Sequence, residues 1–286
     1  PRLLTLQRGR SAMAFDVHTG QFRTSWSRAA ASLGGRRRSR PPRASDWPAW
    51  AMPQLEQAAE LAEHVSTVDG HPVLAAELYR RWFNPVIGHG AKLGRPLAGV
   101  YRAAHASSGI RVQRDDMWVV ERHDVVGRDG WWRTWNDCWV PTRSRTEGVR
   151  IMFSPQPESI AEFVHVMTDR LRDVTSPWLL ACATDPARFG RTAAAILYVP
   201  SVDAIASTLL DDVAPTLRDA TPPLCLPLVA GAALGQSPGN GMSLGEHRCH
   251  LVALALRTAP ARRDPLAAVA EVFRTHGVDP AHPYRS

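Results

Sequence analysis

Four residues near the C-terminal end of the chain have types and a spacing that suit the binding of an anion beside a titratable group. Ser243 precedes Glu246 by three residues, just ahead of an apolar run, which is the pattern of a capping box at a helix N-terminus. The first turn of a helix has unpaired backbone N–H groups and a partial positive charge. His247 and Arg248 follow directly, so an imidazole and a guanidinium would stand beside an anion bound there.

The same segment is dense in side chains of metal-binding type, namely Glu246, His247, Cys249 and His250. On a helix, residues three or four positions apart share a face, so His250 accompanies Glu246 while His247 lies on another face. These side chains cannot all converge on one ion, and the sequence identifies no distant partners for a tetrahedral zinc site. We therefore predict no metal. The alternative roles are a hydrogen-bonded core histidine for His247 and a plain capping residue for Glu246.

A second cationic segment lies between two apolar runs of strand length. It begins at Asp185 and ends at Arg191, which enters the second apolar run directly. The planar guanidinium suits recognition of phosphate, whereas the structural alternative is an ion pair with Asp185 or another acid. Phosphate-loop, dinucleotide-binding and common hydrolase motifs are absent from the sequence. No cofactor is predicted.

Groups that could move a proton are few. Lys92 is the single lysine of the chain, and its amine would have to be desolvated to act as a base near neutral pH. His105, which would share a helix face with Tyr101, is a further candidate.

The elements that must position these residues follow from apolar periodicity. Recurrence every three or four residues predicts helices over 55–65, 73–83, 97–105, 160–171, 205–217 and 243–257. A last helix is expected between Asp264, its cap, and Gly277. Strands are predicted over 149–153, 178–183 and 193–199, and the glycine-rich residues 235–241 predict a turn. Helices at both ends around a central block of strands indicate an α+β domain with a central mixed β-sheet flanked by helices.

An aromatic hairpin is predicted over 118–140, with its turn at 128–130. It contains Trp131, Trp132, Trp135 and Trp139. These tryptophans form either core or a peptide groove, and core is favoured because tryptophans clustered at strand spacing usually pack together.

Charge is distributed unevenly along the chain, whose formal net charge is +7. Residues 1–45 hold ten arginines and one acid, and the remainder is slightly acidic. We predict a basic, disordered tail over 1–45 and one folded domain over 46–286. A tail of this kind can attract nucleic acid, but the solvated arm is the preferred interpretation. Scattered cysteines without a CxxC pair, and no apolar window long enough for a bilayer, predict a soluble, cytoplasmic protein without a membrane partner.

From about residue 149 to 284 the chain resembles the HopA-type effector family, first named for bacterial type III secreted effectors and also found in peptide natural-product clusters. The most specific matching segment is Gly-Glu-His-Arg-Cys at 245–249. Weaker matches in consistent order are 150–153, 184–186, 197–199 and 277–284. The resemblance covers about half of the chain.

The resemblance implies an α+β fold related to phosphothreonine lyases and a role in lanthipeptide or thioamitide biosynthesis. In those pathways a separate kinase phosphorylates Ser or Thr of a ribosomal precursor peptide, and the HopA-like protein eliminates phosphate to leave a dehydroamino acid. The implied partners are the phosphorylated precursor peptide and the kinase-like protein. Arg191 and Arg248 would then hold the phosphate beside Ser243, with His247 as acid or base and Lys92 or His105 as a second proton carrier.

Two departures from the family pattern bear on catalysis. Ala181 stands where many members have a lysine in the first apolar strand, and Ala193 stands where they have an acid shortly after the arginine. A non-catalytic module that binds a kinase or a leader peptide is therefore the alternative to a metal-independent lyase.

Overall fold

The computed structural model describes residues 46–66, 70–88, 96–106, 111–114, 117–120, 124–127, 129–139, 148–202, 207–239, 241–259 and 264–285. These residues belong to one contact unit, residues 42–286. The predicted basic tail and Lys92 lie outside the described residues. No helix within the described ranges is long and apolar enough to cross a membrane.

The fold is α+β and is built on a seven-stranded sheet whose strand order is β3-β4-β6-β7-β5-β9-β8. The strands are β3 (Asp124–Val126), β4 (Trp131–Trp135), β5 (Val149–Phe153), β6 (Leu179–Ala183), β7 (Ala195–Val199), β8 (Leu226–Val229) and β9 (Ala232–Gln236). Every neighbouring pair is antiparallel. The prediction of a mixed sheet is wrong in this respect, because no helical crossover joins two neighbouring strands in the way that parallel pairing requires.

The two strands predicted for the aromatic hairpin do not pair with each other. β4 pairs with β3 through a turn in which Gly130 has φ +80°, a left-handed value that suits glycine. The strand predicted at 118–120 lies in β2 (Met117–Val120), which instead pairs with β1 (Arg111–Arg114) in a separate two-stranded sheet.

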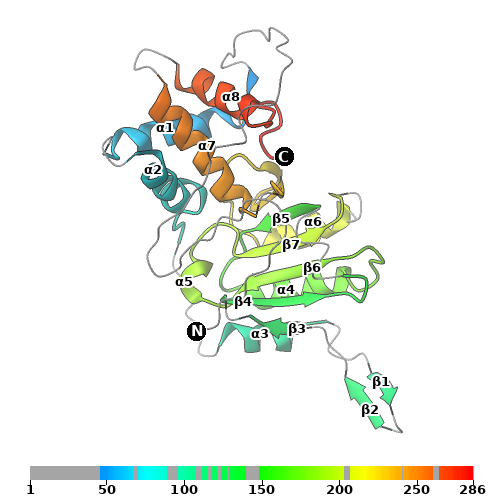
Figure 1. The fold of residues 1–286 in the computed structure, drawn as a ribbon. Helices are drawn as coiled ribbons and strands as arrows, with labels where there is room; N and C mark the ends of the chain where they lie inside the picture. Colours follow the sequence, from blue (N-terminus) through cyan, green and yellow to red (C-terminus); the bar gives the residue numbers. More distant parts are fainter. Residues whose placement is uncertain are drawn as a thin grey trace, which may run out of the picture. The chain divides into compact units, whose positions relative to one another are not determined.

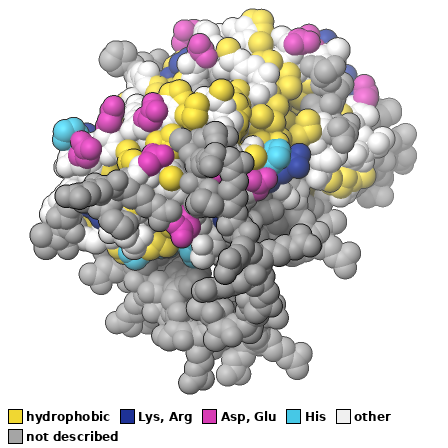
Figure 2. Space-filling view, turned by 90° about the horizontal axis from the view of Figure 1, so that it is seen from above, with side chains coloured by type: hydrophobic (Ala, Val, Ile, Leu, Met, Phe, Trp, Pro, Cys, Tyr) yellow, Lys and Arg dark blue, Asp and Glu magenta, His cyan; other side chains and the backbone are white. Residues whose placement is uncertain are grey.

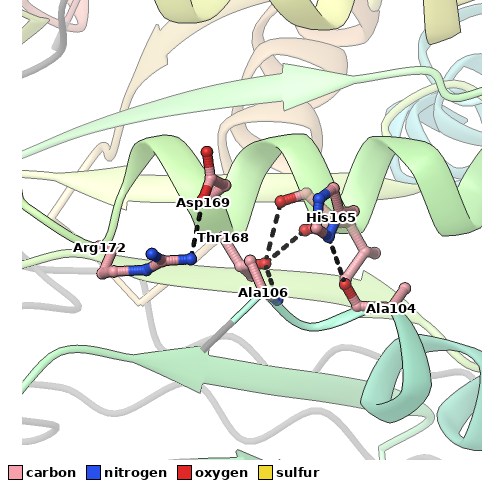
Figure 3. Close-up of polar contacts among 7 residues, drawn as sticks. Ala104, Ala106, His165, Thr168, Asp169 and Arg172 are labelled. Atoms are coloured by element: carbon pink, nitrogen blue, oxygen red, sulfur yellow. Dashed lines mark hydrogen bonds and ion pairs between the residues drawn. The ribbon is translucent and has the colours of Figure 1, made fainter. Parts of the chain in front are cut away.

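One face of the seven-stranded sheet is covered by α3 (Leu97–Ala104), α4 (Ile160–Arg170) and α6 (Ser207–Val213). Alternate strand residues such as Trp132, Phe153 and Leu197 meet the apolar stripe of α4 in the largest core. Thr168 on α4 joins this helix to the end of α3, since its Oγ1 accepts from the Ala106 N–H at 2.9 Å and donates to the Val164 carbonyl (Figure 3).

A second group of helices forms its own core, and part of it packs on the opposite face of the sheet. These helices are α1 (Met52–Glu63), α2 (Gly70–Leu78), the π-helical turn η3 (Tyr79–Phe83), α7 (Leu244–Thr258) and α8 (Pro265–Thr275). The helices α1, α2, α7 and α8 lie together at the top of Figure 1. Two short helical elements remain, α5 (Pro186–Phe189) and the 3-10 turn η5 (Ala214–Thr216). Leu244 at the start of α7 shares a core cluster with Met152 of β5 and lies so close to Gly235 of β9 that a Cβ there would clash. This contact sets the N-terminus of α7 on the sheet.

Candidate functional site

The first turn of α7 has the capping box that the sequence predicts. The Ser243 Oγ accepts from the Glu246 N–H at 3.2 Å, and the Glu246 carboxylate accepts from the Ser243 N–H at 2.8 Å. These bonds leave the N–H groups of Leu244 and Gly245, the first two helical residues, as donors without an intrahelical acceptor. The start of α7 therefore retains donors and a partial positive charge for an anion.

Arg248 does not take part in such a site, which corrects the prediction that it holds phosphate. Its side chain has no solvent exposure, its Nε donates to the Pro283 carbonyl at 2.6 Å, and another guanidinium nitrogen donates to the Arg285 carbonyl. Burial lowers the pKa of Arg248 to about 10, so the group stays charged at neutral pH. Its charge is used to hold the C-terminal segment against α7, and no surface remains for a ligand.

His247 also points away from the predicted site. Its Nδ1 accepts from Arg248, and its ring shares a cluster with His250 of α7, His276 at the end of α8 and His71 of α2. Burial is the largest cause that lowers the pKa of His247 to about 4, and the charges of Arg248 and the neighbouring imidazoles act in the same direction. A neutral imidazole whose Nδ1 is already occupied is a poor general base at neutral pH.

These histidines do not form a metal centre. The rings of His71 and His250 meet edge to face, with centroids 5.1 Å apart. Within the described part of the chain, no group of three or more His, Cys, Asp or Glu side chains has the geometry to hold a metal ion.

Arg191 lies near the N-terminal end of β7, where it is half-buried. One guanidinium nitrogen donates to the Asn84 carbonyl at 2.7 Å, and its backbone bridges to Val86. This pairing ties the segment after η3 to the start of β7. Arg191 thus has a structural partner, although a carbonyl rather than the predicted acid, and no contact joins it to Arg248 among the described residues.

His105 is separated from α7 by the sheet. It is buried, and its Nε2 makes a 2.9 Å hydrogen bond with the Thr134 hydroxyl on the face that packs against α3 and α4. The predicted convergence of His247, Arg248 and Arg191 on one phosphoryl group is therefore wrong, and His105 cannot join them from behind the sheet.

Two residues that the sequence reasoning did not select stand at the start of α7 instead. The ring of Tyr79 packs over Gly245, and its hydroxyl interacts with the Ser243 side chain. Burial is the largest cause that raises the pKa of Tyr79, the Glu246 carboxylate adds to it, and the Arg188 guanidinium and Ser243 oppose it. Arg188 is exposed, lies over the Trp131 ring at 5.7 Å, and has no ion pair within the described ranges. The capped helix end thus adjoins a protonated phenol, and the arginine that acts on this phenol has no ion pair in the described part of the chain.

Through the contact of Arg188 with Trp131, these groups border a smaller, largely buried apolar cluster on the sheet, which we call the aromatic face. It consists of Trp131, Trp135, Trp139, Leu179, Ala181 and Tyr198. Trp132 points to the opposite side and belongs to the main core. Trp139 is buried in the smaller cluster and Trp131 and Trp135 pack against it, so the four tryptophans pack in two core clusters, as the favoured alternative expects.

Ala181 lies within the aromatic face, at the position where the family resemblance implies a lysine. It pairs with Arg133 of β4 and Ile196 of β7, and Ile196 pairs with Met152, which belongs to the same core cluster as Leu244. Residues directly opposite in register point to the same side of a sheet. The start of α7 and Ala181 consequently share one face.

Comparison with known proteins places this fold. The model of the HopA1 effector protein family matches residues 140–285. Two solved structures, effector proteins from Pseudomonas syringae pv. tomato strain DC3000 and from Pseudomonas syringae pv. syringae strain 61, superpose with TM-scores of 0.59 and 0.57. Each is 16% identical, and each alignment covers 82% of this chain and 96% of that one, so the likeness shows the fold. No curated protein sequence matches.

The family match confirms the resemblance that the residues carry. It spans half of the chain and includes the strands β5 to β9 and the helices α7 and α8. The chain belongs to the HopA1 effector protein family.

Proposed function

We propose that this protein is a lyase that eliminates phosphate from phosphoserine or phosphothreonine of a ribosomally made precursor peptide, in a lanthipeptide- or thioamitide-type pathway. The phosphorylated peptide comes from a separate kinase-like partner. The observation that carries the proposal is the Tyr79 hydroxyl at Ser243, the cap of α7, within the electrostatic influence of the Arg188 guanidinium, which lies over the Trp131 ring.

A phosphate ester suits this position because its charge is about −1.5 to −2 at neutral pH. The N–H groups of Leu244 and Gly245 would donate to its oxygens, and Arg188 would supply the charge that Arg248 does not. Glu246 opposes an anion, but its carboxylate is already bonded to the Ser243 N–H.

Elimination breaks the bond between Cβ and the ester oxygen after a base removes the α-proton, and the phosphate departs with a proton or a balancing cation. Tyr79 stays protonated because its pKa is raised, so it can donate a hydrogen bond to the departing oxygen. Lys92 remains the proposed base. Lys92 lies outside the residues that the structure describes, so this role rests on the sequence alone.

The proposal is tested by incubating the protein with the precursor peptide, its kinase and ATP, and following loss of phosphoric acid by mass spectrometry. Arg188→Ala should slow that loss by roughly tenfold or more, the usual effect of removing a charged hydrogen bond. Arg172→Ala is the matched control, because Arg172 is an exposed arginine paired with Asp169 on the far side of the sheet (Figure 3). A phosphopeptide left intact by the wild-type protein rules out the lyase.

A second candidate function is a non-catalytic module that binds the phosphopeptide, its leader or the kinase. The observation in its favour is that Ala181 and Ala193 present methyl groups where the family pattern implies a lysine and an acid. Under this function, Lys92→Ala leaves dehydration in the complete pathway unchanged, whereas Arg188→Ala still weakens peptide binding. A lyase loses turnover in both variants.

A further inference from the structure

The turn that carries Tyr79 has an uncommon geometry. η3 is π-helical, so the Asn84 N–H donates to the Tyr79 carbonyl at 2.9 Å, whereas in an α-helix it would donate to the Arg80 carbonyl. Single π-helical turns are rare and occur frequently at functional sites. Pro85 follows at once and has no N–H with which to extend the helix. Tyr79 therefore stands at the junction of α2 with an unusual turn that needs support from outside.

Two side chains from the segment between α5 and β7 provide this support. The last carbonyls of a helix lack intrahelical donors. The Phe83 carbonyl of η3 accepts from the buried Thr192 hydroxyl at 3.1 Å. The carbonyl of the cap residue Asn84 accepts from an Arg191 guanidinium nitrogen at 2.7 Å, and the charge of the donor strengthens this bond. The end of the turn is thus fixed by two residues that are consecutive in the sequence.

Arg188, the arginine of the proposed phosphate site, has supports of its own. The helix α5 that carries it begins at the cap residue Asp185, and at its end the Phe189 carbonyl accepts from the Arg218 guanidinium. Neither bond involves the Arg191 side chain. Removal of the Arg191 guanidinium should therefore leave Arg188 in place and disturb the turn that holds Tyr79.

We propose that Arg191 is a positioning residue, which holds the π-helical turn so that the Tyr79 hydroxyl stands at the start of α7. The inference deepens the proposed function, on which it rests for the role of Tyr79 as the donor to the departing phosphate oxygen. Arg191 acts through the Asn84 carbonyl and does not touch the substrate. Thr192 assists it through the Phe83 carbonyl.

The consequence of losing Arg191 follows from helix geometry. A π-helical turn contains one residue more than an α-helical turn, so relaxation to α-helical pairing rotates the two sides of the turn relative to each other by about 100°. The rings of Tyr79 and Phe83 stack with centroids 5.9 Å apart, and both lie against Gly245. After such a rotation the two rings cannot both keep this contact, and the Tyr79 hydroxyl moves away from Ser243.

The first test separates binding from turnover, with phosphorylated precursor peptide prepared with the kinase. Arg191→Met should lower kcat for phosphate loss about tenfold, the lower range for loss of a proton donor, while KM changes less than about twofold because Arg188 stays in place. Arg191→Lys keeps a charged donor and should restore most of kcat. Arg257→Met is the matched control, since Arg257 also donates to backbone carbonyls, those of Val65 and Ser66. It should keep the wild-type kcat.

The second test follows Tyr79 itself, without substrate. In protein labelled with ¹³C at the tyrosine ring carbon that bears the hydroxyl, the NMR signal of Tyr79 is identified by its loss in Tyr79→Phe. Burial holds the pKa of Tyr79 above its ordinary value, so in the wild-type protein this signal titrates above about pH 10. Arg191→Met should bring the titration down toward that pH, and Arg257→Met should leave it unchanged. Thr192→Val, which removes one hydroxyl, should lower it to a smaller extent.

A Tyr79 titration that is the same in Arg191→Met and in the wild-type protein would overturn the proposal. A raised KM with unchanged kcat would also overturn it, since Arg191 would then be a ligand of the phosphate. If Arg191→Met does not fold, Thr192→Val decides, and an unshifted titration there rejects the positioning role. A shifted titration in a protein without lyase activity rejects the lyase alone, and lyase activity with an unshifted titration rejects the positioning alone.

Discussion

The two sides of the first turns of α7 use arginine in opposite ways. On one side Arg248 is sealed beneath the C-terminal segment, where it donates to the Pro283 and Arg285 carbonyls. On the other side Arg188 is exposed, lies over the Trp131 ring, and acts electrostatically on Tyr79, whose hydroxyl interacts with Ser243. Arg248 of the Gly-Glu-His-Arg-Cys segment therefore has a structural role, and the cation that we assign to the ligand is Arg188 of α5.

The physical cause of this difference is that a buried arginine needs an acceptor for its guanidinium N–H groups, whereas an exposed one can donate to water. A buried guanidinium must have its N–H groups satisfied, and carbonyl oxygens of a chain end provide acceptors at short range. Once that is done, the side chain is part of the core and its removal is a stability effect. The histidines beside Arg248 are likewise part of the helical layer, because burial lowers the pKa of His247 and of His250 and keeps them neutral at pH 7. Figure 2 shows hydrophobic side chains, in yellow, gathered on the face of the molecule that is seen from above.

The largest expected effect is that of Arg248→Ala. The substitution leaves the Pro283 and Arg285 carbonyls without their donor and opens a cavity under the C-terminal segment, so the free energy of unfolding should fall by about 3 to 5 kcal/mol. Urea unfolding followed by tryptophan fluorescence measures it. An unchanged urea midpoint would mean that Arg248 is not a structural residue, and the contrast between the two sides of α7 would fail.

The sequence predicted this helix well and its partners poorly. The capping box of Ser243 and Glu246 and the Asp264 cap of α8 are local patterns, and both are confirmed. Which way His247 and Arg248 point depends on where the C-terminal segment and α8 pack. Those contacts join residues far apart in the chain, so helix periodicity alone could not predict them.

The sheet shows the same limit. Strands β5, β6 and β7 were predicted from their apolar runs, whereas β9 was missed because Ala232, Ala233 and Gly235 are small and have low strand propensity. The glycine-rich turn predicted from residue 235 begins inside this strand. Gly235 is needed there because Leu244 occupies the space of a side chain. Tyr79 was missed for a related reason, since only the π-helical turn after α2 carries it to the start of α7.

The packing of Tyr79 on α7 gives the next largest effect. A methyl group at Gly245 would collide with Phe83 and Tyr79, so Gly245→Ala should lower the free energy of unfolding by about 1 to 3 kcal/mol and displace the Tyr79 hydroxyl from Ser243. Gly99→Ala is the matched control. Gly99 lies in α3 with open space around it, so alanine there should stabilise by roughly 0.5 kcal/mol. Equal effects of the two substitutions would contradict the close contact.

Acid should affect the Arg248 side of α7 selectively. The pKa of His247 is lowered to about 4, and those of His250 and His276 are lowered as well, all chiefly by burial. The unfolded chain therefore takes up protons near pH 6.5 while the folded protein does not, so stability is full above pH 6.5 and declines as the pH falls toward 4. Urea midpoints measured from pH 7 to 4.5 show this decline, and His247→Asn should make it shallower. The same slope in both proteins would exclude His247 as its source.

Arg188→Ala should have the smallest effect on stability. It is the sharpest test of the comparison between Arg188 and Arg248, because Arg188 is the arginine that we assign to the ligand. Arg188 is exposed and its described contact is the cation–π approach to Trp131, which contributes about 0.5 to 1 kcal/mol at such a site. Arg188→Ala should therefore unfold within about 1 kcal/mol of the wild-type protein, yet bind phosphopeptide at least tenfold more weakly. Arg248→Ala should show the opposite pattern. It should lose several kcal/mol of stability, whereas the protein that remains folded should bind phosphopeptide with nearly the wild-type affinity, since Arg248 contacts the chain's own carbonyls and no ligand. If Arg188→Ala lost several kcal/mol of stability, Arg188 would be a second structural arginine, and the start of α7 would have no cation left for a phosphate.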